Sequence, residues 1–160
     1  MKIVSACLCG INCKYNGGNN LNPYFLDLMS DGELIPVCPE QLGGLPTPRT
    51  ACELAGGTGL DVIEGHALAY TRNGQDVTRG LLKGAQETLS IAINASIKEA
   101  ILQSRSPSCG NGTIYDGTFT GKLINGDGVT SALLKQHGIH VWNEQEYLRE
   151  KGVMNSFESS

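Results

Sequence analysis

The sequence predicts a single α/β domain with a mostly parallel (Rossmann-like) sheet flanked by helices. Three observations lead to this class. Short apolar runs alternate along the chain with helical stretches, which is the pattern of parallel strands joined by helices. A length of 160 residues suits one domain with a sizeable core. When Gly is counted and Tyr is left out, half of the residues are apolar, an ordinary globular value that argues against disorder.

The N-terminal part of the chain is predicted as a strand, a helix and a second strand. Residues 2–6 form an apolar run that is typical of a buried strand. Asn22 can cap a helix whose first position is Pro23, where the missing N–H of proline has no cost. Residues 34–37 are again apolar and predict the second strand. Because Pro36 cannot donate a hydrogen bond to a neighbouring strand, this strand is expected at an edge or to end early.

The middle of the chain is predicted as a loop, a short strand and the longest helix. Residues 43–59 contain several turns with Pro or Gly and show no period, so they are expected to be loop. Residues 67–71 predict a short strand before an Asn-Gly turn. Apolar residues recur near every 3.6 positions over about 78–96, which predicts a helix capped by Asp76 or Thr78.

The C-terminal part is predicted to contain a strand, a Gly-rich loop, a helix, a strand and a terminal helix, in that order: 100–102, 110–128, 129–137, 139–142 and from 143 onwards. The domain is expected to span residues 1–152. Residues 153–160 are expected to form a flexible tail.

Composition and charge argue against several classes of partner. The formal net charge is −4 with only 12 Lys and Arg, which argues against a broad surface for nucleic acid or an anionic membrane. No apolar run approaches the roughly 18 residues of a membrane helix. Residues 4–7 look like the end of a lipoprotein signal, but too few residues precede Cys7 for a signal peptide. The chain is therefore expected to be cytoplasmic, where its six Cys would be buried fillers, nucleophiles or metal ligands rather than disulfides.

Three of the cysteines follow predicted strands. Cys7, Cys38 and Cys109 each come after a different one. Ligands bind outside the carboxyl ends of the strands in open parallel sheets, so these three thiols could meet at one point. No C-x-x-C motif is present. Three thiols without an evident fourth protein ligand suit either a cubane iron–sulfur cluster with one open iron or a zinc ion with one open position.

Five segments contain or lie between these cysteines and occur in this order: residues 5–8, 12–17, 37–49, 74–78 and 106–110. They resemble the thiouracil desulfidase (TudS) family, long known as a domain of unknown function, and the resemblance runs from residue 5 to about residue 142. Cys38-Pro39-Glu40 and the segment from Ser106 to Gly110 carry the resemblance most specifically.

The resemblance implies a [4Fe–4S] cluster held by Cys7, Cys38 and Cys109. It also implies that the open fourth iron takes the sulfur of a thiolated pyrimidine while water replaces that sulfur on the base, and that hydrosulfide is released with no net redox change. Glu40 would be the acid–base residue and Ser106 a helper beside the substrate.

The chemistry of the residues agrees with these roles. Iron is a soft acceptor for sulfur, whereas Mg²⁺ and Ca²⁺ are not. A carboxylate two residues from a ligand can deprotonate water. Arg49 is a candidate for neutralising the charge of the cluster or for binding a carbonyl of the substrate.

The remaining cysteines, Cys9, Cys13 and Cys52, are not expected to be ligands, although Cys13 could be a reactive or spare thiol. The three histidines show no metal-ligand spacing with one another or with the cysteines: His66, His137 and His140.

Some relatives that act on thiolated tRNA carry an additional C-terminal domain. This chain ends at residue 160 and is acidic, so a free base or nucleoside is the expected substrate, with no nucleic acid or membrane partner. Two alternatives remain open. One is a non-catalytic metal-binding or cluster-binding module such as a redox sensor, and the other is a zinc-dependent hydrolase that uses the same three thiols.

Overall fold

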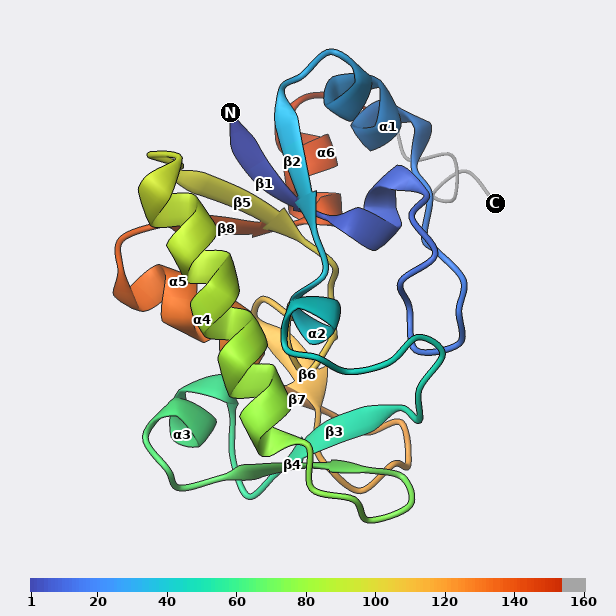
Figure 1. Cartoon of the computed structure of the whole chain (residues 1–160), viewed down its shortest axis with the longest axis vertical. Coiled ribbons are helices and arrows are strands. Elements are labelled where there is room, and N and C mark those ends of the chain that lie inside the picture. The colour runs from blue at the N-terminus through green and yellow to red at the C-terminus, as the bar shows by residue number, and fades with distance from the viewer. Residues whose placement is uncertain (154–160) are drawn as a thin grey trace.

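Four parallel strands form the centre of the fold (Figure 1): β1 (Lys2–Ser5), β2 (Leu34–Val37), β5 (Glu99–Leu102) and β8 (His140–Asn143). The computed structural model describes residues 1–153 of the chain. The strand order is β2-β1-β5-β8, and each neighbouring pair is parallel. The predicted α/β class is confirmed, and β2, which contains Pro36, lies at an edge as expected.

Helices cover both faces of this sheet (Figure 1). On one face, Val4 and Ile101 pack with residues of α1 (Pro23–Ser30) and α6 (Glu144–Glu150). On the other, Ile3 packs with residues of α4 (Thr78–Asn94) and α5 (Val129–Gln136). Successive strand residues thus point to opposite faces, and the sheet is buried on both sides.

The predicted capping is confirmed at α1 and is wrong at α4. Asn22 Oδ1 accepts a hydrogen bond from Tyr24 N at 2.9 Å, which confirms this residue as the cap of α1. At α4 the cap position is occupied by Val77, which has no polar side chain. Asp76, one residue earlier, accepts from Thr78 N at 2.9 Å instead. Both hydrogen bonds satisfy backbone donors that the first helical turn leaves without partners.

Both predicted long loops are wrong. Residues 43–59 contain β3 (Cys52–Ala55), which pairs antiparallel with β4 (Leu68–Thr71). Residues 110–128 contain an antiparallel pair, β6 (Thr113–Tyr115) and β7 (Leu123–Asn125). None of the three strands β3, β6 and β7 forms an apolar run of the kind that predicted the strands of the parallel sheet. The strand predicted at 67–71 exists as β4, but because β4 pairs with β3, it lies outside the parallel sheet.

Three one-turn helices were also not predicted: the 3₁₀ helix η1 (Ala6–Cys9), α2 (Pro39–Leu42) and α3 (Gly59–Ile63). The first of them shortens the predicted first strand, which ends at Ser5. η1 and α2 directly follow β1 and β2, so they place their residues at the carboxyl ends of those strands (Figure 1).

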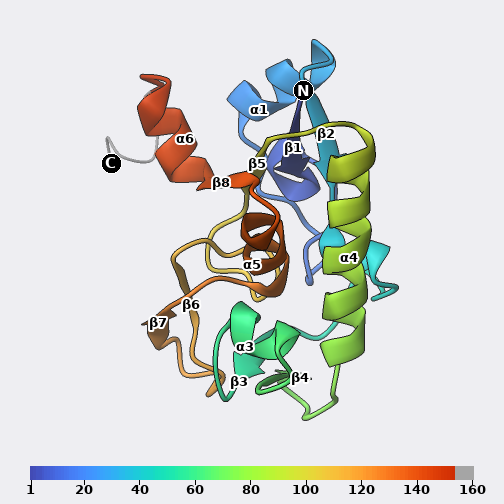
Figure 2. The ribbon, with the colours of Figure 1, turned by 90° about the vertical axis from the view of Figure 1, so that its left-hand side faces the viewer.

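A third hydrophobic cluster joins the antiparallel pairs to the rest of the domain. Leu54 of β3, Ala69 of β4 and Ile114 of β6 pack with Leu81 and Ala85 of α4. Helix α4 runs from this cluster to the parallel sheet, so it connects the two parts of the molecule (Figure 2). The short strands are thereby fixed beyond the carboxyl ends of the parallel ones.

The C-terminal end of the described chain packs on the domain. Val153 N donates a hydrogen bond to Leu148 O at 2.9 Å, and the Val153 side chain packs against the cluster around α1 and α6. The packed chain thus extends one residue beyond the expected boundary at 152. The rest of the expected tail, residues 154–160, lies outside the described residues. None of the helices in residues 1–153 is long and apolar enough to cross a membrane.

Candidate functional site

A cavity of about 960 Å³ lies at the carboxyl ends of the parallel strands, between the sheet and the antiparallel pairs. The structure brings together along its wall every site residue that the sequence singled out: Cys7, Cys38, Glu40, Arg49, Ser106 and Cys109.

The three cysteines reach this cavity from three different strands. Cys7 lies in η1 directly after β1, and Cys38 lies between β2 and α2. Cys109 follows β5 in a loop held from both sides, because its N–H donates to Ser106 Oγ at 3.0 Å and its carbonyl accepts from Ser131 Oγ at 2.8 Å. β2 lies on one side of β1 and β5 lies on the other side, so the order of the strands reverses at β1. Open α/β sheets bind ligands at such a point.

The thiols lie close to polar groups but are not gathered into one tight group. Cys7 Sγ is 3.8 Å from Asn20 Nδ2. Cys38 Sγ is 3.7 Å from the carbonyl oxygen of Cys13 and 4.0 Å from Glu40 Oε1. Within residues 1–153, no three cysteine sulfurs all lie within 4.8 Å of one another.

The surroundings of Cys38 and Cys109 favour the protonated thiols. A hydrogen bond with the Cys13 thiol, then burial and the charge of Glu40, raise the pKa of Cys38 above its ordinary value. Burial, and then Glu40, raise the pKa of Cys109 well above that value. A metal ion deprotonates the thiols that it binds. Cys38 and Cys109 are therefore thiolates at neutral pH only when a positive group, such as a metal ion, balances their charge.

Helix α2, which carries Glu40, is held against α4 by direct backbone contact. A Cβ atom added to Gly84 would lie 1.9 Å from the carbonyl oxygen of Pro39, and one added to Gly43 would lie 1.9 Å from that of Gly80. Only glycine allows this approach. The position of Glu40 in the first turn of α2 is thus fixed by glycines in two separate segments.

Arg49 lies against Glu40. Its Nη2 atom is 3.5 Å from Glu40 Oε2, and the two side chains are only 10% and 15% exposed. The same guanidinium donates to the carbonyl of Cys13 at 3.0 Å and to Thr47 Oγ1 at 3.1 Å. Arg49 is therefore committed to protein groups, and its clearest structural role is to hold the carboxylate and the Cys13 loop.

Ser106 organises the loop that carries Cys109. Its Oγ accepts hydrogen bonds from Ser108 N at 3.1 Å and from Cys109 N at 3.0 Å. A hydroxyl has two acceptor positions and one proton. Both acceptor positions are used by the backbone, and the proton remains for a further acceptor in the cavity.

The other three cysteines differ in their relation to the cavity. Cys9 does not line it; its Sγ lies 3.7 Å from the carbonyl of Phe25, and burial raises its pKa to about 11. Cys13 and Cys52 do line it. Burial and then the charge of Glu40 raise the pKa of Cys52 to about 12.

The wall opposite the three strand ends was missed by sequence reasoning. Glu53 of β3 accepts from Gly117 N at 2.9 Å and from Phe119 N at 3.2 Å. The guanidinium of Arg72 lies 5.1 Å from the centre of the Phe119 ring. Glu53, Arg72 and Phe119 line the cavity. These three residues lie at or near short strands in segments without a hydrophobic period, so no local signal in the sequence identified them.

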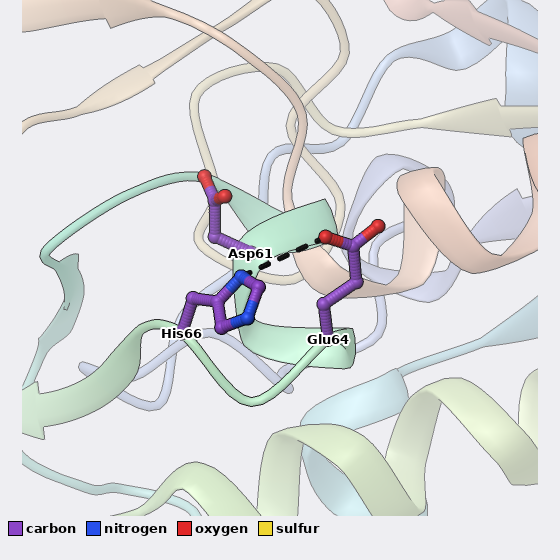
Figure 3. A group of neighbouring side chains, drawn as sticks. All are labelled: Asp61, Glu64 and His66. Atoms are coloured by element: carbon purple, nitrogen blue, oxygen red, sulfur yellow. Dashed lines mark ion pairs between the residues drawn. The ribbon is translucent and has the colours of Figure 1, made fainter.

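The histidines lie outside the cavity. His66 is 70% exposed, and its Nδ1 lies 3.7 Å from Glu64 Oε2, with Asp61 beside them (Figure 3). Sequence spacing did not indicate this grouping. Asp61 already accepts hydrogen bonds from Thr58 N at 2.8 Å and Thr58 Oγ1 at 3.1 Å. The group is therefore a helix cap beside an exposed ion pair.

Known proteins show the same sequence pattern and fold. The model of the 2-thiouracil desulfurase family matches residues 3–146. A relative from Bacillus subtilis (strain 168), the uncharacterized protein YbbK, is 47% identical over 146 residues, which cover 91% of this chain and 97% of that protein. A solved structure of the [4Fe-4S]-dependent thiouracil desulfidase TudS has a TM-score of 0.80 and 37% identity, and the match covers 95% of this chain and 98% of that one. The resemblance seen in the five sequence segments is confirmed, and the chain belongs to the 2-thiouracil desulfurase family.

Proposed function

We propose that this protein removes sulfur from thiolated pyrimidines with a [4Fe–4S] cluster held by Cys7, Cys38 and Cys109. The observation that carries the proposal is the meeting of three strand-end cysteines at one cavity with a carboxylate beside them. The match to a [4Fe-4S]-dependent thiouracil desulfidase over 95% of the chain supports it.

The donor set fits this cofactor. Thiolates are the usual protein ligands of iron–sulfur clusters, and three of them leave one iron open. When bound, the cluster supplies a soft Lewis acid for the sulfur of the substrate. Thiolates at about 2.3 Å from a single tetrahedral ion lie only about 4 Å apart, whereas no three cysteine sulfurs in residues 1–153 lie within 4.8 Å of one another; this favours a cluster over one zinc ion.

Glu40 is the proposed general base. Its Oε2 is held by Arg49 at 3.5 Å, while its Oε1 points toward the Cys38 side of the cavity at 4.0 Å from Sγ. Its carboxylate is the group that would accept a proton from water. Arg49 is thus proposed to orient Glu40 rather than to bind the substrate directly.

Ser106 is proposed to donate its free proton to the substrate while its oxygen keeps Cys109 in place. In the overall step, water forms the new C–O bond at the ring carbon and the C–S bond breaks. One proton of water leaves on the sulfur as hydrosulfide, and the other passes through Glu40 to solvent, which returns Glu40 to its starting form. Uracil and hydrosulfide are the products, and no electrons are gained or lost.

The proposed substrate is a small thiolated base or nucleoside. A cavity of about 960 Å³ has room for such a molecule. The net charge of −4 gives no general attraction for RNA. We also propose a cytoplasmic location, where the ligand thiols stay reduced.

Two experiments test the proposal. Anaerobically reconstituted protein should contain about four irons per chain and release hydrosulfide from 2-thiouracil. Replacing Cys7, Cys38 or Cys109 with Ser should lower the iron content sharply, whereas the matched control Cys52→Ser should leave it unchanged. Zinc without iron would favour a zinc hydrolase. A stable cluster that releases no hydrosulfide from any thiopyrimidine would favour a non-catalytic cluster-binding module.

A further inference from the structure

The thiol of Cys7 has a polar neighbour that the proposed reaction does not use. Asn20 Nδ2 lies 3.8 Å from Cys7 Sγ, although the two residues are 13 positions apart. A backbone hydrogen bond also joins the two residues, because Asn20 N donates to Cys7 O at 2.8 Å. This hydrogen bond holds the side chain of Asn20 beside the sulfur of Cys7. Asn20 also lines the cavity.

The orientation of the Asn20 amide follows from its other partners. Lys14 Nζ donates to Asn20 Oδ1 at 3.0 Å. An ammonium group only donates, so the amide oxygen must face Lys14 and the NH₂ group must face Cys7. The same NH₂ group donates to Gln103 Oε1 at 2.9 Å. Gln103 is in turn fixed by its own N–H, which donates to Ser5 Oγ at 2.8 Å.

We infer that Asn20 is a positioning residue for the cluster, with Lys14 as its support; the inference rests on the proposed function. The amide donates an N–H···S hydrogen bond to the Cys7 thiolate when that thiolate binds iron. The Lys14 charge polarises the amide, which strengthens the bond to the sulfur. Partners behind a metal ligand orient it, and hydrogen bonds to the sulfurs change the reduction potential of a cluster.

The effect has a definite sign. A donor beside the thiolate stabilises negative charge, and the reduced cluster carries one more negative charge than the oxidised cluster. Loss of the donor therefore disfavours reduction. For Asn20→Ala we expect the equilibrium for one-electron reduction to fall about tenfold, which lowers the midpoint potential by about 59 mV. Lys14→Met, which keeps the amide but removes its cation, should shift the potential in the same direction by less.

The test is a dye-mediated redox titration of the reconstituted protein, followed by electron paramagnetic resonance. Asn12→Ala is the matched control, because Asn12 is exposed in the same segment and, within residues 1–153, its side chain accepts only from Asn19, at 2.8 Å. A second readout is the rate at which a chelator removes iron, which should rise in Asn20→Ala and stay unchanged in Asn12→Ala.

The outcomes separate this inference from the function on which it rests. A wild-type chain that takes up no cluster would refute both. A wild-type cluster whose potential is the same in Asn20→Ala, Lys14→Met and Asn12→Ala would overturn the inference and leave the proposed function intact. If Asn20→Ala does not fold, the midpoint potential of Lys14→Met tests the inference instead.

Discussion

Replacing Glu40 with glutamine removes the proposed base and almost nothing else. The side chain keeps its shape in a place where only 15% of it is exposed. Arg49 keeps its hydrogen bonds to Cys13 O at 3.0 Å and Thr47 Oγ1 at 3.1 Å, so it should not move. Glu40 is not itself a proposed ligand, and its Oε1 lies 4.0 Å from Cys38 Sγ, so the iron content should not change.

The expected loss follows from the role of the carboxylate. A positioned general base contributes about 10²- to 10⁴-fold to a rate, which is about 2.7–5.4 kcal/mol of transition-state stabilisation. Glu40→Gln should lose that factor in kcat/KM, measured anaerobically as hydrosulfide release from 2-thiouracil per iron-loaded chain.

Glu64→Gln is the matched control for this substitution, because its carboxylate is 51% exposed and lies outside the cavity. Turnover in Glu40→Gln within threefold of wild type, at equal iron content, would refute the role of general base. Loss of iron together with activity would show instead that Glu40 acts in holding the cluster.

Three further predictions concern stability and packing. Phe25→Ala, at a fully buried position in contact with the rings of Tyr24 and Tyr147, should lower the free energy of unfolding by about 3–5 kcal/mol in urea titrations. Gly84→Ala should be destabilising by about 1–3 kcal/mol, although alanine favours helices, because its Cβ would lie 1.9 Å from Pro39 O; a variant as stable as wild type would contradict the backbone contact. The Cys52 thiol, whose pKa rises from 9.0 to about 12 on burial, binds its proton more tightly in the folded state, so the metal-free protein should lose stability as the pH rises from about 9 toward 12. Cys52→Val should show a smaller loss between pH 8 and pH 10, and an identical slope would contradict the shift.

The elements that the sequence predicted correctly are those with a local signal. The helix beginning at Pro23 has a cap in Asn22, and α4 is long enough for its period to appear. The edge position of β2 follows from one proline. By contrast, β3 has Glu53 among its four residues and β6 is only three residues long, so neither forms a continuous apolar run. Their stability comes from partners elsewhere in the chain, so no local pattern identified them and the segments were predicted as loops.

The sequence by itself determined the α/β class, the family resemblance and the three cysteines that follow strands. Each of these depends on residue type and order along the chain. Only the tertiary structure decided what surrounds those cysteines. Asn20 reaches Cys7, Arg49 holds Glu40, and Glu53 fixes the opposite wall through contacts between distant segments. Such contacts depend on how the sheet, α4 and the short antiparallel strands pack together, and a linear pattern contains no measure of that packing.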